Sequence, residues 1–252
     1  MASKIPRKTA EQAGSGRSLA NLAYARILEV LFERKLPAGS FVSQGELVKL
    51  TGVPVGPLRD ALRVLDAEGV VTIHPRTGIQ FIRPGLELTR STYQFRGILE
   101  AAAVAVFAET APDSEIEALA ERHRDLMARV QHEGVHDELV TELEALENLL
   151  HGSIVASLRN GLIDSSYKRI HNYIRILQLD RRLTPPLVLH TLREHMRIIE
   201  ACRKRNAAEA VAELHAHFDA ALRRNLGLYR YGTAEGQSVE DGAGDRVRSA
   251  GR

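Results

Sequence analysis

The segment from Gln44 to Gly69, QGELVKLTGVPVGPLRDALRVLDAEG, decides the fold of this chain. It contains two short amphipathic runs joined by the tight connection Thr51-Gly52-Val53-Pro54, and its last glycine precedes the β-branched pair Val70-Val71. Two short helices, a turn and a following strand are the pattern of a winged helix-turn-helix, whose second helix enters the major groove of DNA. The segment therefore predicts a DNA-binding domain.

The residues upstream of this segment extend the same domain. Apolar residues recur at helical spacing over residues 19–32 and predict a first helix, which Pro37 and Gly39 separate from a short strand at Phe41-Val42. Ser43 is placed to cap the first of the two short helices. Residues 1–18 are rich in Lys, Arg, Gly, Ser and Gln, and we expect them to form a disordered basic arm.

A hairpin is predicted directly after the second helix. The strands at residues 70–73 and 79–82 flank the cationic tip His74-Pro75-Arg76-Thr77-Gly78, which is typical of a wing. We call the predicted DNA-binding domain, residues 19–84, the head. Its second helix and its wing are expected to share one surface, and the candidate DNA contacts on that surface are Lys49, Arg59, Arg63, His74, Arg76 and Thr77.

Charge is distributed unevenly along the chain. Formal net charge is +2, but residues 1–85 hold 12 Lys and Arg against 7 Asp and Glu, a balance of +5, whereas the remainder has a balance of −3. A basic head on an acidic body suits a polyanion that binds the head alone. The alternative is that this offset is ordinary solvated surface.

The head resembles that of the GntR family of bacterial transcription regulators. The resemblance rests on Leu36-Pro37-Ala38-Gly39, on Pro57-Leu58-Arg59-Asp60-Ala61-Leu62-Arg63 and on the run from Leu65 to Val71. Family members commonly have Ser-Arg-Thr and Glu-Arg where this chain has Pro54-Val55-Gly56 and Gln44-Gly45. Arginines there would contact guanine bidentately, so base reading here is expected to rely on Arg59, the wing around Arg76 and DNA shape.

Beyond the linker Arg83-Pro84-Gly85, the sequence is helical in its periodicity throughout. We call residues 85–230 the body and expect an antiparallel, all-α bundle of six or seven helices that binds an effector and dimerises. Residues 231–252 are polar and glycine-rich and predict a disordered tail. The fold class is therefore mainly α. The helices are predicted at residues 89–109, 114–130, 137–158, 162–179, 187–205 and 207–229.

Nine of the ten histidines lie in the body. Glu147 and His151 are four residues apart, which puts both on one helix face, and His195 and His217 lie on the last two predicted helices. One carboxylate and three imidazoles suit Zn²⁺, Ni²⁺, Mn²⁺ or Fe²⁺. Spacing alone does not show that they converge, and the alternative is a set of surface or core histidines with an ordinary i,i+4 pair.

The body resembles the FCD effector domain of the FadR-type branch of that family. The resemblance rests on Arg96-Gly97-Ile98-Leu99-Glu100, on Glu147 with His151, on Glu194-His195 and on residues 207–217. In FCD domains, an Asp four residues before a His and two later histidines bind a metal that helps to hold a small carboxylate. The resemblance implies the metal ligands Glu147, in place of Asp, His151, His195 and His217.

Two further residues are candidates for the effector pocket. A guanidinium can hold a carboxylate bidentately, which makes Arg96 a candidate for a second effector contact. The alternative for Arg96 is a salt bridge with Glu100 one turn later. Asn172, in the middle of the predicted bundle, is a candidate for lining the pocket.

These observations predict a homodimeric, cytoplasmic repressor of transcription that binds operator DNA and a small carboxylate effector. The single cysteine, Cys202, excludes an internal disulfide framework, and the longest apolar run, residues 101–108, is too short to span a membrane. Two alternatives remain open at this point: a metal-dependent enzyme that acts on a small carboxylate, and a regulator whose pocket holds no metal.

Overall fold

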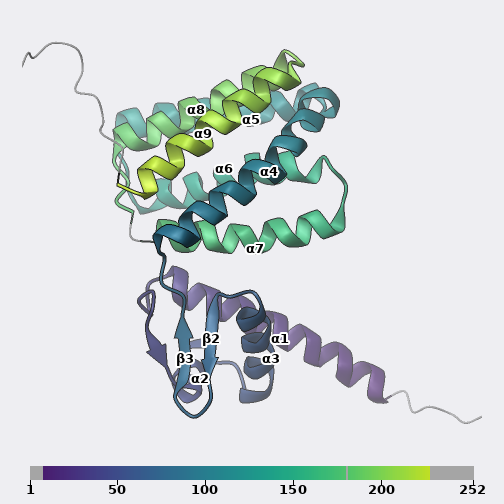
Figure 1. Ribbon diagram of the computed structural model, residues 1–252, viewed down its shortest axis with the longest axis vertical. Helices are drawn as coiled ribbons and strands as arrows, with labels where there is room; N and C mark the ends of the chain where they lie inside the picture. Colours follow the sequence, from purple (N-terminus) through teal and green to yellow (C-terminus); the bar gives the residue numbers. More distant parts are fainter. Residues whose placement is uncertain (1–7, 180, 228–252) are drawn as a thin grey trace, which may run out of the picture.

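The computed structural model describes residues 8–179 and 181–227, with side chains from residue 19 onward. Figure 1 shows two parts stacked along the long axis, a helical bundle above and a smaller unit of helices and strands below. The lower unit is the head and the upper one is the body, which confirms a mainly α fold with an N-terminal winged helix-turn-helix.

The head packs three helices against a small antiparallel sheet in which β3 lies between β1 and β2. Ile27, Leu58 and Phe81, from a helix, the next helix and a strand, are almost completely buried in one apolar core. The elements are α1 (Lys8–Phe32), β1 (Phe41–Val42), α2 (Gln44–Thr51), α3 (Val55–Ala67), β2 (Val71–His74) and β3 (Gly78–Phe81).

Helix α1 begins eleven residues earlier than the sequence predicts. The expected disordered arm at 1–18 is wrong for residues 8–18, which are helical; residues 1–7 lie outside the described part. Lys, Thr, Ala, Glu and Gln in this stretch are compatible with a helix, and an existing helix extends at little cost because nucleation has already occurred. The absence of apolar residues therefore does not exclude a helix in this stretch.

Local signals determine the turns of the head. Ser43 and Glu46 form a reciprocal capping box at the start of α2, with Glu46 N–H donating to Ser43 Oγ at 3.2 Å and Ser43 N–H donating to Glu46 Oε2 at 2.8 Å. Gly52 ends α2 in the left-handed region. At Gly78, with φ +132°, a Cβ would lie 2.8 Å from the Val42 carbonyl oxygen, so only glycine lets β1 and β3 pair closely.

The body is a bundle of six helices within the described residues, as expected. Its core is built from apolar side chains such as Val104, Ile154 and Leu214, all of which are fully buried. None of the helices in the described ranges has the length and apolar character needed to cross a membrane. The helices are α4 (Leu86–Thr110), α5 (Asp113–Glu133), α6 (Asp137–Ala156), α7 (Gly161–Gln178), α8 (Pro185–Arg203) and α9 (Ala207–Asn225).

Helix α7 of the body packs against the head (Figure 1). Ile176 is fully buried and packs in the core of the head. The Tyr173 hydroxyl donates to the Glu68 carbonyl at the end of α3, and Asn172 Nδ2 donates to the Tyr24 hydroxyl of α1 at 2.8 Å. Tyr24 in turn donates to the Glu68 carboxylate at 2.7 Å, so one polar chain joins α7, α1 and α3.

Candidate metal centre and DNA-binding face

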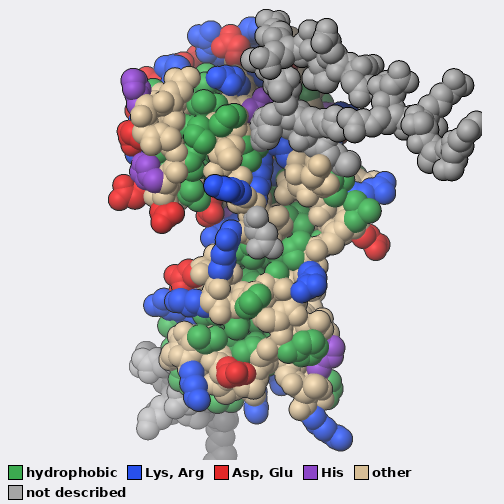
Figure 2. Space-filling view, turned by 90° about the vertical axis from the view of Figure 1, so that its left-hand side faces the viewer, with side chains coloured by type: hydrophobic (Ala, Val, Ile, Leu, Met, Phe, Trp, Pro, Cys, Tyr) green, Lys and Arg blue, Asp and Glu red, His purple; other side chains and the backbone are tan. Residues whose placement is uncertain are grey.

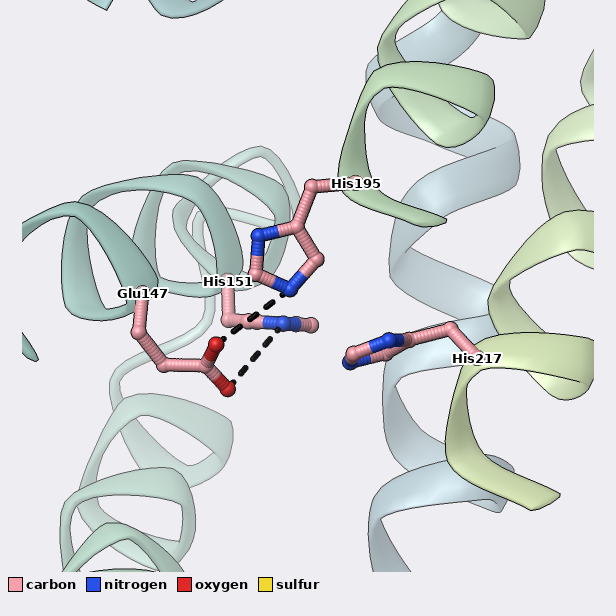
Figure 3. Close-up of side chains that lie close together, drawn as sticks. All are labelled: Glu147, His151, His195 and His217. Atoms are coloured by element: carbon pink, nitrogen blue, oxygen red, sulfur yellow. Dashed lines mark ion pairs between the residues drawn. The ribbon is translucent and has the colours of Figure 1, made fainter. Parts of the chain in front are cut away.

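Four side chains from three helices of the body converge on one point. Glu147 and His151 extend from α6, His195 from α8 and His217 from α9 (Figure 3). Their nearest nitrogen and oxygen atoms all lie within 4.8 Å of one another. Glu147 Oε2 is 3.2 Å from His195 Nε2, and Glu147 Oε1 is 3.5 Å from His151 Nε2. The structure therefore brings together the four residues that the sequence singled out as metal ligands. We call them the metal cluster.

Two of the three imidazoles, those of His151 and His217, are each oriented by a buried carboxylate. His151 Nδ1 lies 2.6 Å from Glu100 Oε2, and His217 Nδ1 lies 2.8 Å from Glu194 Oε2. An ionised carboxylate only accepts hydrogen bonds, so both Nδ1 atoms carry the proton. In the neutral form of such a ring, the lone pair is on Nε2, the atom that faces the cluster.

The third imidazole is oriented by another histidine. His123 Nδ1 lies 2.7 Å from the Leu119 carbonyl oxygen, which can only accept, so this nitrogen carries the proton. Burial lowers the pKa of His123 to about 3, which keeps its ring neutral. His123 Nε2 is therefore an acceptor for His195 Nδ1–H at 3.2 Å, and the lone pair of His195 also lies on Nε2.

Three buried nitrogen atoms in the cluster are left without a hydrogen bond. They are Nε2 of His151, His195 and His217, whose rings are at most 2% exposed. Buried polar atoms are rarely left unsatisfied, because each costs about 1–3 kcal/mol. Burial also lowers the pKa of His195 and lowers that of His217 to about 3, so proton binding does not satisfy the nitrogens of these two rings near neutral pH.

A divalent cation fits this donor set. Three imidazole lone pairs and one carboxylate suit a first-row metal, and bonds of about 2.0–2.2 Å place ligand atoms at most about 4.4 Å apart. The ligand atoms lie within 4.8 Å of one another, so at most small side-chain movements are needed to close the cluster on an ion. The carboxylates behind His151 and His217 are the usual outer partners that fix the orientation of metal-binding imidazoles.

Arg96 lies beside the metal cluster and already has anionic partners. Its Nε donates to Glu100 Oε1 at 2.6 Å, its Nη2 lies 3.7 Å from Glu147 Oε1, and its guanidinium stacks 4.4 Å from the Phe218 ring centroid. Burial raises the pKa of Glu100, but Arg96 and His151 outweigh it and the net pKa lies below the ordinary value. The salt bridge with Glu100 is thus present, and Arg96 also lies close enough to the cluster to contact a ligand there.

Sequence reasoning missed the residues that orient the rings, and it did not reveal the contact that Asn172 makes with the head. Glu100 and Glu194 were noticed only as neighbours of Arg96 and His195, and His123 was not singled out. The Asn172 amide donates to the Tyr24 hydroxyl at the contact between body and head, where Asn172 lines a hollow together with Tyr24, Glu68 and His171. It lies on the side of α7 that faces the head, which the spacing of polar residues along that helix did not reveal.

The candidate DNA contacts lie on the surface of the head. Lys49, Arg59, Arg63, Arg76 and Thr77 are exposed and His74 is half-buried. Figure 2 shows Lys and Arg side chains spread over the lower part of the molecule, with few Asp and Glu among them. These contacts are therefore available to a polyanion, although nothing in the fold fixes most of them in place.

Several of these side chains have a weak partner within the head. Arg59 Nε donates to Gln44 Oε1 at 3.3 Å, which links α3 to α2, and Arg63 Nη1 lies 3.6 Å from Asp60 Oδ1. On the wing, His74 Nε2 lies 3.0 Å from Gln80 Oε1. The first turn of α3 has no side-chain cap, so no capping side chain occupies its backbone N–H groups, and helix N-termini of this kind can bind phosphate.

Comparison with known families agrees with both parts of the structure. Residues 19–81 match the bacterial regulatory proteins of the gntR family, and residues 91–220 match the FCD domain, which covers more than half of the chain. The chain belongs to the GntR family and carries an FCD domain. The resemblance identified from the sequence is confirmed, and members of this family are transcriptional regulators and not enzymes.

Individual relatives give the same picture. The HTH-type transcriptional regulator YdhC of Bacillus subtilis is 24% identical over 196 residues, which cover 78% of this chain and 86% of YdhC. Two solved structures share the fold. They are McbR/YncC from E. coli, with a TM-score of 0.70, 14% identity and coverage of 84% of this chain and 99% of that one, and a transcriptional regulator GntR from Rhodococcus sp. RHA1, with a TM-score of 0.68, 19% identity and coverage of 84% and 100%.

Proposed function

We propose that this GntR-family regulator is a cytoplasmic repressor whose affinity for operator DNA is controlled by a small carboxylate effector. The effector binds at a divalent metal ion held by Glu147, His151, His195 and His217. One observation carries the proposal: three buried imidazole nitrogens with no hydrogen-bond partner face one carboxylate in the middle of the body. A regulator without a metal leaves these atoms unsatisfied, which disfavours that alternative.

The metal would supply open coordination positions for an oxygen ligand. Four protein ligands fill a tetrahedral ion, whereas an octahedral Ni²⁺, Mn²⁺ or Fe²⁺ keeps two positions open. An effector carboxylate that reaches those positions also meets Arg96, whose Nη2 is 3.7 Å from Glu147 Oε1. Arg96 can then contact the effector and keep its bond to Glu100, because a guanidinium has five N–H donors.

Helix α7 is suited to carry a change in the body to the head. An effector shifts the arrangement of the two parts only if it binds the alternative arrangements unequally. Ile176, Tyr173 and Asn172 join α7 to the head core, to the end of α3 and to α1. A movement of α7 therefore changes the position of the helix that enters DNA.

We propose that the protein is a homodimer. A two-fold dimer presents two winged heads, and each head can then bind one half of a pseudo-palindromic operator. The outer face of α4 supports it, because Ile98 is 71% exposed and Phe95 is 40% exposed on neighbouring turns. Exposed apolar side chains of this size, one turn apart, suit burial against a second copy.

DNA binding provides the direct test. Fluorescence anisotropy of the metal-loaded protein with its own upstream DNA should show a salt-sensitive preference over random duplex near physiological ionic strength. A small carboxylate should weaken that binding. Arg59→Ala should abolish the preference, whereas Arg26→Ala, an exposed arginine that pairs with Glu29 on α1, should preserve it. Equal affinity for both duplexes at all salt concentrations would refute the proposal.

A further inference from the structure

A cavity of about 320 Å³ lies between the body and the head. Its volume falls in the range of small-molecule sites, about 300–1,000 Å³. On the body side it is lined by residues of α6, α7 and α8, which include the metal-cluster residue Glu147. On the head side it is lined by the end of α1, at Phe32, and by Arg34. One cavity therefore borders both Glu147 of the metal cluster and the DNA-binding head.

The lining combines aliphatic and charged side chains. Leu143 and Leu187 are among the aliphatic side chains that line the cavity. Glu147 of the metal cluster lines it from the body. The Arg175 guanidinium lies 3.7 Å from the centroid of the Phe32 ring, so this cation lies where the cavity borders the head.

The acidic residues of the cavity already have cationic partners. Glu144 Oε2 lies 3.6 Å from Arg175 Nη2, and Glu33 Oε2 lies 2.5 Å from Lys35 Nζ. Arg34 has no carboxylate partner among the described residues, and its backbone is left-handed, with φ +58°. Burial lowers the pKa of Arg175, which shows that this cation has lost part of its hydration. The head end of the cavity therefore favours an anion.

We propose that the effector is a dicarboxylate with an apolar chain, and that it spans this cavity. One carboxylate binds at the metal beside Glu147, the chain lies between Leu143 and Leu187, and the second carboxylate binds Arg34 and Arg175. This inference rests on the proposed function, because it assigns the ligand class of the same site. Since Arg34 follows α1 directly and α1 packs against α3, such a ligand touches the DNA-binding head itself.

Isothermal titration calorimetry on the metal-loaded full chain measures the affinity for three kinds of ligand. These are acetate, the diacids adipate, suberate and sebacate, and the monoacids with the same numbers of carbon atoms. The affinity for acetate reports on binding at the metal alone. Affinity should rise about fourfold per methylene until the cavity is filled, the fold-change equivalent to about 0.8 kcal/mol. Each diacid should bind at least about tenfold more tightly than its monoacid, as expected for a charge-assisted contact.

Variants separate the two ends of the site. Arg34→Gln should remove the preference for diacid over monoacid and leave acetate binding unchanged. Arg159→Gln is the matched control, because Arg159 is also exposed after a helix and left-handed, with φ +49°. Acetate binding with no gain from chain length or from the second carboxylate would overturn this inference alone. If no acid binds, both this inference and the proposed control by an effector are overturned. The DNA-binding part of the proposed function is tested separately, by the preference for operator over random duplex.

Discussion

The metal cluster and the DNA-binding face differ in how firmly the fold holds their side chains. At the cluster, His151, His195 and His217 are buried, and each ring is fixed by a second buried residue. On the head, Arg63 keeps 77% of its side chain exposed and its nearest carboxylate is 3.6 Å away. A site for a small ion needs ligand atoms placed in advance, whereas a phosphate backbone is met by side chains that adjust on contact.

Removing two ligands should destroy the preorganised site completely. In the His151→Ala, His217→Ala double variant, two of the four donors are lost, so metal content should fall from about one ion per chain to none. Elemental analysis after dialysis measures this. His215→Ala is the control, since His215 is exposed on the same helix as His217. Unchanged metal in the double variant would show that the ion, if bound, lies elsewhere.

Removing a support without touching a ligand should weaken the site by less. His123→Ala takes away the acceptor for His195 Nδ1–H at 3.2 Å, so the His195 ring can rotate or change tautomer. Loss of such an outer partner typically costs 10–100-fold in metal affinity, which chelator competition measures. His132→Ala, an exposed histidine on the same helix, should have no effect. Equal affinities for both variants would mean that His195 is held by packing alone.

The contact between α7 of the body and the end of α3 in the head can be tested at Gly69. Its φ is +75°, and a Cβ there would lie 2.7 Å from the Tyr173 hydroxyl oxygen. Gly69→Ala should cost about 1–2 kcal/mol in the free energy of unfolding for the left-handed backbone, and about 1 kcal/mol more for the displaced hydrogen bond. Gly52→Ala, with φ +68° and open space around it, should show only the first cost. Urea denaturation measures both.

A double-mutant cycle isolates the contact between α7 and the head. Tyr173→Phe removes the hydroxyl that a Cβ at Gly69 would displace. In this background, Gly69→Ala should cost only as much as Gly52→Ala does in the wild type. If the extra cost persists without the hydroxyl, the contact of α7 with the end of α3 does not stabilise the junction, and the proposed route from body to head loses its support.

The sequence predicted those features that depend on neighbouring residues. The Ser43 cap, the turn at Gly52 and the hairpin tip with Gly78 were predicted from local signals, and the structure adds the reciprocal bond from Glu46 and the left-handed Gly52. The i,i+4 spacing of Glu147 and His151 placed both ligands on one face of α6. Their meeting with His195 and His217 depends on how three helices pack, so it entered only through resemblance to the FCD domain.

Roles set by packing alone were missed. His123 supports His195 across 72 positions of sequence, and no spacing rule connects the two residues. Asn172 was expected to line the effector pocket because it lies midway along the bundle, and its bond to Tyr24 was missed because the polar face of α7 is shared between the body and the head. A polar residue on a helix that joins two domains has two possible surroundings, and only the arrangement of the domains decides between them.

The smallest expected effect is at Arg63, where the contrast between the two regions is sharpest. Its ion pair with Asp60 is exposed on both sides, so Arg63→Gln should change the free energy of unfolding by less than about 0.5 kcal/mol. As a phosphate contact, Arg63 should contribute equally to operator and random DNA.

The Arg63→Gln variant should therefore bind both kinds of DNA several-fold more weakly, and the magnitude of the slope of log affinity against log salt should decrease by about 1. Anisotropy titrations at several salt concentrations measure this slope. A loss confined to operator DNA would mean that Arg63 reads a base, and the DNA-binding face would then be positioned as specifically as the metal cluster.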